Sequence, residues 1–394
     1  MPYVRRFELR TSQSADELKA WYIRRYRDAR TESDFLRIKF PRIGAAPSYL
    51  YVPVSLTERP ADLAKLLTDK GANWSPDVTE RRKAIEIIAK KLPDQIGTML
   101  SQGGWHGEIF MLGTDPIGCK DQRYILRNEF VPQAKESIGC SGTLAEWQER
   151  VARPAAKSRY AMFAIMHGLA APLFRFAGLD EGAIFHLGGD GSTGKTSALM
   201  AGASVAGASE LTDWNSSERG MHERAAIMSG LQIVLDDTER QPATAARVAA
   251  LNTLSHTLTS GRSQTYSRVV KGSLPDLRWD CWALSSGPST MEHAAQKVGY
   301  TRTDGDRVRW IDIPSPAAVS GGIWDLARCD SEEDYARLSE ALREAASQFH
   351  GEVARKWIRL LQVNQNLCRE HIPTAIERFI SRNCPDAGSV ERRI

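Results

Sequence analysis

A short run in the middle of the chain has the composition of a phosphate-binding loop. It reads Gly-Asp-Gly-Ser-Thr-Gly-Lys-Thr and matches the pattern G-x-x-x-x-G-K-[ST]. Glycines let backbone N–H groups approach a phosphate, and a following helix adds its positive N-terminal end. Lys195 is expected to neutralise β- and γ-phosphate charge, and the Thr196 hydroxyl to bind Mg²⁺. The sequence therefore predicts ATP and Mg²⁺ as ligands, with the nucleotide held by Gly189, Asp190, Gly191, Ser192, Thr193, Gly194, Lys195, Thr196 and Ser197.

Two carboxylates end an apolar run further along the chain, where Asp236 and Asp237 follow residues 231–235. We expect this run to be a strand that neighbours the strand of the loop, so that its acidic end lies beside the loop. Asp236 would then bind Mg²⁺, and Asp237 would orient or deprotonate the attacking water. The alternative is a strand that ends in a solvated turn.

A third apolar run, at 281–284, leads into Ser285, Ser286 and a glycine. Catalytic groups of open α/β sheets gather at the carboxyl ends of strands, so a serine hydroxyl is expected to contact the γ-phosphate or the water. The sequence does not separate Ser285 from Ser286, and a plain Ser-Ser-Gly turn is the alternative.

Arginines occupy the predicted start of a fourth strand, at 308–313. In ring-shaped ATPases an arginine placed in this way enters the neighbouring subunit's site and stabilises charge on the γ-phosphate. We predict this role for Arg309, ahead of Arg307, provided that a ring forms. A solvated strand end is the alternative.

The segment 261–278 is a candidate for binding DNA. It contains Arg262, Arg268, Lys271 and Arg278 against one carboxylate, Asp276. Its alternation predicts a β-hairpin with a basic tip, on which Tyr266 offers an aromatic surface to a base. A solvated hairpin without a partner is the alternative. Residues 21–27 also interleave aromatic residues with arginines, which an amphipathic surface helix explains equally well.

The elements that must position these residues predict an α/β fold. The glycine-rich loop follows a strand at 183–187, and short apolar strands then alternate with helical segments. This order is typical of a mainly parallel sheet that is covered by helices on both faces. We expect a P-loop ATPase core over 141–330, preceded by an α+β accessory domain over 1–140 and followed by a helical segment over 331–394.

Individual elements are predicted from capping and periodicity. Thr143 and Glu146 form a capping box for a helix that Pro154 should break, and a second helix should follow over 157–178. The N-terminal domain should contain these helices and strands: helices at 15–28, 61–69 and 78–92, and strands at 35–40, 48–54 and 108–112.

Composition excludes several classes of protein. The chain has 394 residues, of which 42% are hydrophobic and 25% charged, and this composition argues against a disordered or fibrous protein. Its longest apolar run, 161–174, is too short to span a bilayer, and the N-terminus lacks a signal-peptide core, so we expect a cytoplasmic protein with no membrane contact. A net charge of +4 does not by itself indicate nucleic-acid binding. The scattered cysteines predict neither a disulfide framework nor a zinc site.

In combination, these features resemble the phage, plasmid and integrative-element ATPases that carry the domain of unknown function 927, relatives of the hexameric replicative helicases. The resemblance covers about residues 45–390. The segments that carry it are residues 103–107, the loop at 189–196, residues 203–207, Trp214, the strand end at 235–237, residues 279–287 and Arg309.

The resemblance implies an AAA-type core that assembles into a homo-oligomeric ring, such as a hexamer. It further implies that ATP hydrolysis is coupled to movement on single-stranded DNA during replication, often with a primase as partner. Asp237 stands where the family usually has glutamate, Pro288 replaces a common glutamate, and the chain stops at Ile394, about where the family continues. Two alternatives stay open: a monomeric P-loop kinase, and a nucleotide-binding scaffold or loader with little turnover.

Overall fold

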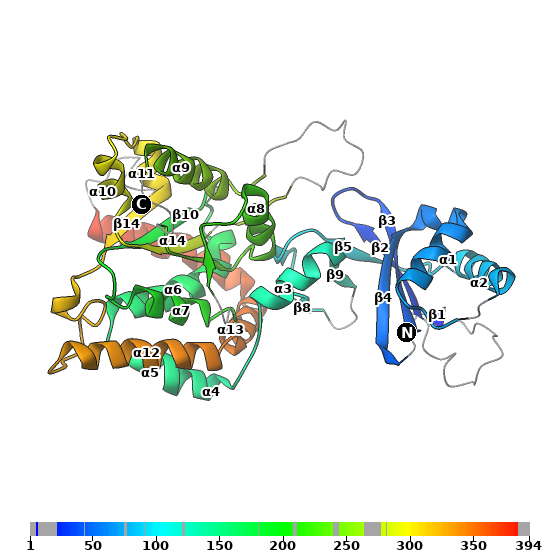
Figure 1. Cartoon of the computed structure of the whole chain (residues 1–394), viewed down its shortest axis with the longest axis horizontal. Coiled ribbons are helices and arrows are strands. Elements are labelled where there is room, and N and C mark those ends of the chain that lie inside the picture. Colours follow the sequence, from blue (N-terminus) through cyan, green and yellow to red (C-terminus); the bar gives the residue numbers. More distant parts are fainter. Residues whose placement is uncertain are drawn as a thin grey trace. The chain divides into compact units, whose positions relative to one another are not determined.

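The computed structural model describes most of the chain. The described residues are 5–6, 22–42, 44–74, 77–90, 92–119, 123–179, 181–207, 211–238, 244–263, 277–280 and 282–384. They form two compact units (Figure 1). The first lies within Met1–Ser101 and Cys119–Asn128, and the second within Gln102–Gly118 and Glu129–Ile394.

The two units differ in extent from the predicted domains. Much of the segment between Gln102 and residue 140, which we assigned to the N-terminal domain, packs with the second unit. The C-terminal helical segment also packs with the second unit and is not a separate body.

The first unit is a sheet covered by two helices on one face. Its strand order is β4-β3-β2-β5-β9, in which β2 to β4 are antiparallel and β5 and β9 extend the sheet in parallel. The elements are β1 (Arg5–Arg6), β2 (Tyr22–Asp28), β3 (Asp34–Arg42), β4 (Ala45–Pro53), a 3₁₀ helix (Val54–Glu58), α1 (Pro60–Asp69), α2 (Val78–Lys90), β5 (Ile96–Leu100) and β9 (Tyr124–Leu126).

The predicted helix at 15–28 is wrong over its described part, because Tyr22–Asp28 is strand β2. Residues 15–21 lie outside the described residues. Pairing with β3 along its length decides this segment, since it buries Ile23 in the core that α1 and α2 share with the sheet. The predicted strands at 35–40 and 48–54 and the helices at 61–69 and 78–92 are confirmed within a few residues.

The second unit contains a five-stranded sheet in which all strands are parallel, in the order β11-β12-β13-β10-β14. This confirms an α/β fold with a parallel sheet. The strands are β10 (Ala183–Gly188), β11 (Thr212–Asp213), β12 (Gln232–Asp236), β13 (Trp282–Gly287) and β14 (Trp310–Pro314). A small antiparallel sheet contains β6 (Gly104–His106), β7 (Ile109–Leu112) and β8 (Asp115–Ile117).

Helices cover both faces of the parallel sheet. Figure 1 shows α6 and α7 on one side of β10 and α9 to α11 on the other. The helices are α3 (Val131–Ser137), α4 (Leu144–Trp147), a π-helical turn (Gln148–Ala152), α5 (Arg153–Ala155), α6 (Arg159–Ala170), a 3₁₀ helix (Ala171–Phe176), α7 (Lys195–Ala203), α8 (Glu218–Ile227), α9 (Ala245–Thr259), α10 (Met291–Lys297), α11 (Asp304–Arg309), a 3₁₀ helix (Ala318–Ser320), α12 (Glu332–Gln348), α13 (Glu352–Val363) and α14 (Gln365–Asn383). None of the described helices is both long and apolar enough to cross a membrane.

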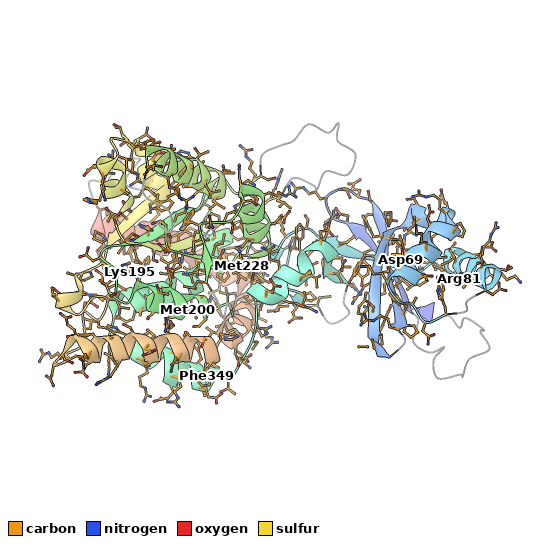
Figure 2. All side chains as sticks on the ribbon, in the orientation of Figure 1. Asp69, Arg81, Lys195, Met200, Met228 and Phe349 are labelled. Atoms are coloured by element: carbon orange, nitrogen blue, oxygen red, sulfur yellow. The ribbon has the colours of Figure 1, made fainter. Side chains whose placement is uncertain are left out.

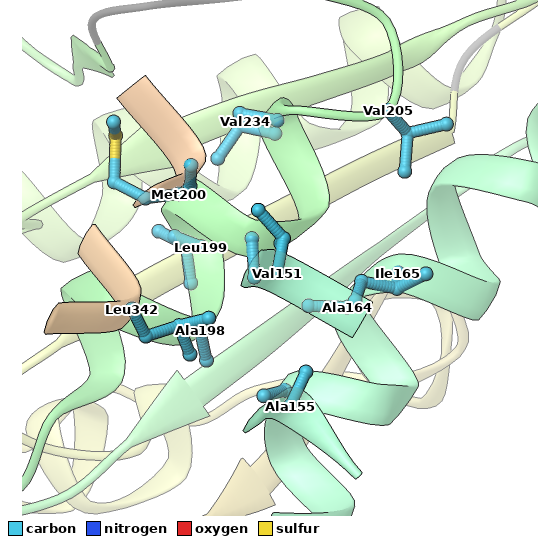
Figure 3. Close-up of a cluster of buried hydrophobic side chains, with 14 of the residues drawn as sticks. Val151, Ala155, Ala164, Ile165, Ala198, Leu199, Met200, Val205, Val234 and Leu342 are labelled. Carbon is cyan, nitrogen blue, oxygen red and sulfur yellow. The ribbon is translucent and has the colours of Figure 1, made fainter. Parts of the chain in front are cut away.

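The core of the second unit joins the helices to the sheet. Figure 3 shows Ala164 of α6, Leu199 of α7 and Val234 of β12 in one apolar cluster, which Leu342 of α12 completes. Burial of each leucine or valine side chain contributes roughly 1.5–3 kcal/mol, so α7 and the loop before it are held firmly against the sheet. The capping box at Thr143 and Glu146 is confirmed, whereas Pro154 lies within the helical run rather than breaking it.

His167 on α6 is a buried imidazole that makes folding sensitive to acid. Its ring stacks on Trp282 at 5.0 Å, and neither ring nitrogen has a hydrogen-bond partner among the described residues. Burial lowers its pKa from 6.5 to about 3. Below pH 6.5 the unfolded chain therefore binds a proton at His167, whereas the folded chain binds it only when the pH falls to about 3.

We expect this histidine to lower the free energy of unfolding by up to about 1.4 kcal/mol per pH unit as the pH falls from 6.5 toward 3. Urea unfolding at several pH values measures this slope. In His167→Phe the contribution should be absent, and the same slope in both proteins would contradict the assignment.

Candidate functional site

The glycine-rich loop lies between the carboxyl end of β10 and the start of α7, as predicted. Two of its residues have left-handed backbone, Ser192 with φ of 60° and Gly194 with φ of 89°. A Cβ on Gly194 would lie 2.8 Å from Ser339 Oγ and 2.9 Å from Ile323, so both the backbone and the packing require glycine there. Ile323 N donates to Thr193 O at 2.9 Å and holds the loop from outside.

Lys195 lies within this loop and is buried. Its Nζ donates to the carbonyls of Gly189, at 2.8 Å, and Asp190, and to Thr193 Oγ1 at 3.1 Å. Burial lowers the pKa of Lys195, and the nearby carboxylates of Asp190, Asp236 and Asp237 oppose that shift. The ammonium group is therefore held by neutral oxygens at the start of α7. Figure 2 labels Lys195 within the second unit.

Asp236 reaches the loop from a strand that is not its direct neighbour. We expected β12 beside β10, but β13 lies between them. The predicted proximity nevertheless holds, since Thr196 Oγ1 donates to Asp236 Oδ2 at 3.1 Å. Parallel strands end at one edge of the sheet, and this arrangement brings the two residues together across the intervening strand.

Asp237 follows in left-handed backbone, with φ of 53°, and its N–H donates to Asp236 Oδ1 at 3.1 Å. Aspartate is one of the few residues besides glycine that adopt this conformation readily. Both aspartates line the same cavity as the loop.

The structure distinguishes Ser285 from Ser286, which the sequence did not. Ser286 lines the cavity, and its hydroxyl hydrogen-bonds to Asp236 Oδ1. Ser285 points away and is fully buried, where it accepts from Trp214 Nε1 at 2.9 Å and bonds to His186 Nδ1 at 3.1 Å. Successive side chains of a strand alternate between its faces, so of the two serines only Ser286 is directed into the cavity.

This separation predicts different outcomes for two similar substitutions. Ser285→Ala removes the hydrogen-bond partner of Trp214 Nε1 and of His186 Nδ1 and should lower the free energy of unfolding by about 1–3 kcal/mol. Ser286→Ala should lower ATP turnover, yet cost about 1 kcal/mol or less, because Asp236 keeps its other donors. Denaturant unfolding and phosphate release measure both effects. Equal losses of stability in the two variants would contradict this difference.

The cavity has a volume of about 710 Å³, and one wall of it comes from α12. Ser197 Oγ of α7 donates to Ser339 O of α12 at 2.7 Å, which fastens the two helices. Sequence reasoning missed the residues of this wall. The helix was predictable from its periodicity, but which element it faces was not. Apart from the loop, the aspartates and residues 286–288, the lining consists of Ala318, Gly321, Gly322, Glu332, Glu333, Tyr335, Ala336, Ser339, Glu340 and Arg343.

Arg309 lies far from this cavity within its own chain. It is the last residue of α11 rather than part of a strand, and it precedes β14 at the amino edge of the sheet, opposite the glycine-rich loop. Its guanidinium donates to Glu181 Oε2 at 2.7 Å. Arg307 pairs with Glu292 and Asp304, which raise its pKa. Neither arginine lines the cavity of its own chain.

The predicted hairpin at 261–278 is described only at its base. Arg262 and Arg278 pair as an antiparallel bridge, and both side chains are exposed. Tyr266, Arg268 and Lys271 lie outside the described residues.

The oxygens at the end of β12 fit Mg²⁺. Thr196 Oγ1 and Asp236 Oδ2 are hard oxygen donors on one wall of the cavity, with Asp237 beside them. The part of the chain that the structure describes holds no group of three or more histidine, cysteine or acidic side chains placed to bind a metal. A site with few protein ligands suits Mg²⁺, which commonly keeps its waters and shares phosphate oxygens with a substrate.

Comparisons with known proteins bear on the family and the fold of this chain. A family model described as "Domain of unknown function (DUF927)" matches residues 23–269. The solved structure described as "SCCmec type IV Cch - active helicase" is 14% identical, with a TM-score of 0.70, and the match covers 95% of this chain and 67% of that one. That TM-score shows a shared fold.

A second structure, "The A form apo structure of NrS-1 C terminal region-CTR", is 11% identical with a TM-score of 0.35, and the match covers 91% of this chain and 74% of that one. Among curated proteins, none matches the chain significantly.

Proposed function

The chain belongs to the DUF927 family, as its sequence predicted, and from that premise we propose that it is a Mg²⁺-dependent ATPase with an AAA-type P-loop core. One observation carries the proposal. Lys195, the Thr196 hydroxyl and the carboxylate of Asp236 converge on a single cavity at the carboxyl edge of a parallel sheet. This is the edge at which α/β proteins bind their ligands.

The loop would bind the phosphates of ATP through its backbone. The first N–H groups of an α-helix lack the carbonyl partners that later ones have and carry the positive end of the helix dipole, and α7 begins at this loop. Lys195 would exchange the carbonyls of Gly189 and Asp190 for phosphate oxygens, which carry full charge and are stronger acceptors.

Thr196 and Asp236 would hold Mg²⁺, which supplies charge neutralisation to the phosphates when it is bound. Asp237 would orient or deprotonate the attacking water, and Ser286 would position Asp236 or contact the γ-phosphate. Arg343 lines the same cavity and would be a further cation close to the nucleotide.

A helicase-like activity on single-stranded DNA is the second part of the proposal. It is supported by the fold shared with a structure described as an active helicase. Ring assembly would give Arg309 its role, because the arginine lies at the edge of the sheet opposite Lys195 and so could reach only another subunit's cavity. Release from Glu181 would accompany that contact. From the family we further expect a hexameric ring, a primase partner and a role in DNA replication within a mobile element.

A nucleotide-binding scaffold with little turnover is the second candidate, and Asp237 favours it. Its carboxylate is one methylene shorter than the glutamate usual in the family, and its left-handed backbone fixes where the side chain starts. Tight ATP binding without phosphate release would select this candidate.

The experiment that tests the proposal is phosphate release from ATP by the full chain, with Mg²⁺ or with a chelator, and with or without single-stranded DNA. A mass determination under the same conditions reports ring assembly.

A further inference from the structure

A short segment brings the carboxyl end of β13 into the cavity and ends just before α10. We call residues 286–289 the β13 loop, and its first three residues line the cavity. Its backbone is tied to two other parts of the site. Thr238 N, just after the acidic strand, donates to Ser286 O at 3.2 Å. Gly189 N, in the glycine-rich loop, donates to Gly287 O at 3.3 Å. A shift of the β13 loop would therefore move the Ser286 hydroxyl relative to both parts.

A buried histidine bridges the two ends of the β13 loop. His186 lies on β10, in register with Ser285 of β13, and is 1% exposed. Its Nε2 lies 3.0 Å from Ser289 O, and its Nδ1 lies 3.1 Å from Ser285 Oγ. Trp214 Nε1 donates to the same Ser285 hydroxyl at 2.9 Å. One imidazole thus contacts the residue before the loop and the last residue of the loop.

The chemistry of these groups fixes the direction of each hydrogen bond. A carbonyl oxygen only accepts, so Nε2 of His186 must carry a proton and donate to Ser289 O. Burial lowers the pKa of His186, which keeps the ring neutral, and Nδ1 is then an acceptor. An indole N–H only donates, so the Ser285 hydroxyl accepts from Trp214 and donates to His186. The hydrogen bonds therefore run in one direction, from Trp214 to the backbone of the β13 loop.

Neighbouring rings and a glycine hold the imidazole in place. The centroid of the His186 ring lies 5.2 Å from that of Trp310, which in turn stacks on Trp214 at 4.9 Å. A Cβ on Gly287 would lie 3.0 Å from Cε1 of His186, so glycine is needed for the loop to pass this close to the ring. The imidazole is therefore a fixed support for the loop.

The helix after the β13 loop is held by a different residue. Asp312 of β14 lies beside His186 in register. Its carboxylate accepts from Met291 N at 2.9 Å and from Glu292 N at 3.0 Å, and Arg302 pairs with it at 3.2 Å. The start of α10 therefore stays fixed without His186. Loss of the histidine hydrogen bond should loosen the β13 loop and leave the helix in place.

His186 reaches the cavity only through the β13 loop. Ser286 lines the cavity and His186 does not, so the imidazole neither touches a bound nucleotide nor transfers a proton to it. What the imidazole controls is the position of the loop from which Ser286 hydrogen-bonds to Asp236. Displacement of a reacting group by about 1 Å can cost roughly 100-fold in rate.

We propose that His186 is a positioning residue for ATP hydrolysis. Through the Ser289 carbonyl it would hold the β13 loop where the Ser286 hydroxyl meets Asp236 beside the transferred phosphate. This role rests on the proposed function, whereas the hydrogen bonds from Trp214 to the loop do not.

The test is the steady-state turnover of ATP by the full chain, together with its affinity for a fluorescent ATP analogue. His186→Phe keeps a ring against Trp310 but removes both hydrogen bonds, and it should lower kcat roughly 10- to 100-fold. Nucleotide affinity should match that of the parent chain, because the hydrogen bonds of Lys195 lie within the glycine-rich loop. His186→Gln places an amide N–H near the position of Nε2 and should recover most of the lost kcat.

His167→Phe is the matched control. His167 is also a buried histidine, but it stacks on Trp282 and has no hydrogen-bond partner among the described residues. It should keep the kcat of the parent chain. Thermal unfolding of each variant identifies losses that come from misfolding.

A nitrogen-15 spectrum of the parent chain tests the hydrogen bonds without any variant. Assigned from the backbone resonances of β10, the His186 ring should be protonated at Nε2 and unprotonated at Nδ1. A ring protonated at Nδ1 alone would overturn the proposal, because Nε2 could not then donate to Ser289 O.

Two kinetic results would also overturn this role: a kcat like that of the parent chain in folded His186→Phe, or equal losses of kcat in His186→Phe and His186→Gln. Lys195→Ala in the same assay separates this role from the proposed function. Turnover that survives in Lys195→Ala, or a parent chain without turnover, would overturn the proposed function. An active parent chain and an inactive Lys195→Ala, beside fully active His186→Phe, would overturn the role of His186 alone.

Discussion

Substitution of Lys195 by alanine is expected to reduce ATP turnover by roughly 100-fold or more, since it removes the cation nearest the transferred phosphate. The side chain is buried and directed into its own loop, where three oxygens hold the ammonium group. Alanine would also remove the charge that makes the loop attractive to an anion, so nucleotide affinity should fall as well. Phosphate release and the affinity for a fluorescent ATP analogue measure the two effects.

Lys356→Ala is the control for this variant. Lys356 is a surface lysine whose side chain is 56% exposed and pairs with Glu352, outside the cavity. It should retain full turnover. Unchanged turnover in a folded Lys195→Ala protein would refute the site, because Lys195 is the one lysine that lines the cavity among the residues that the structure describes.

Asp236→Asn is expected to reduce ATP turnover by roughly 100-fold. Nucleotide binding measured in the presence of a chelator, which does not depend on Mg²⁺, should be unchanged. The amide keeps the size of the side chain but loses the charge that would hold Mg²⁺. It also disturbs three contacts that meet on this carboxylate, from Thr196, Ser286 and the Asp237 N–H. Turnover measured across Mg²⁺ concentrations should show that the variant needs more Mg²⁺ than the parent chain.

Asp304→Asn provides the comparison for that variant. Asp304 is 80% exposed at the start of α11, outside the cavity, and its loss of charge should not alter the Mg²⁺ requirement. The same Mg²⁺ dependence in Asp236→Asn and the parent chain would remove Asp236 from the metal site, and would leave Asp237 as the candidate.

The glycine-rich loop and the acidic strand end were predictable because their chemistry is local. A loop that wraps a phosphate needs glycines at fixed spacing, and the flanking strand and helix follow from short apolar runs and capping. The helix predicted over residues 22–28 was wrong because the choice there is not local. Its residues suit a helix or a strand, and pairing with β3 decided between them.

Residues whose role depends on orientation were not predictable. Ser285 and Ser286 are adjacent and chemically identical, and only the direction of β13 places one in the cavity and the other against Trp214. The same holds for Arg309, whose position at the end of α11 and pairing with Glu181 follow from packing.

By itself, the sequence determined the chemistry at the centre of this protein: a glycine-rich loop with a lysine, a hydroxyl and two carboxylates, in an α/β chain. Tertiary structure decided which strand separates β12 from β10, which serine faces the cavity, and that α12 forms one wall of it. The physical reason is that spacing along a chain fixes local backbone geometry. Strand order and the choice of buried face depend on apolar burial summed over segments distant in sequence.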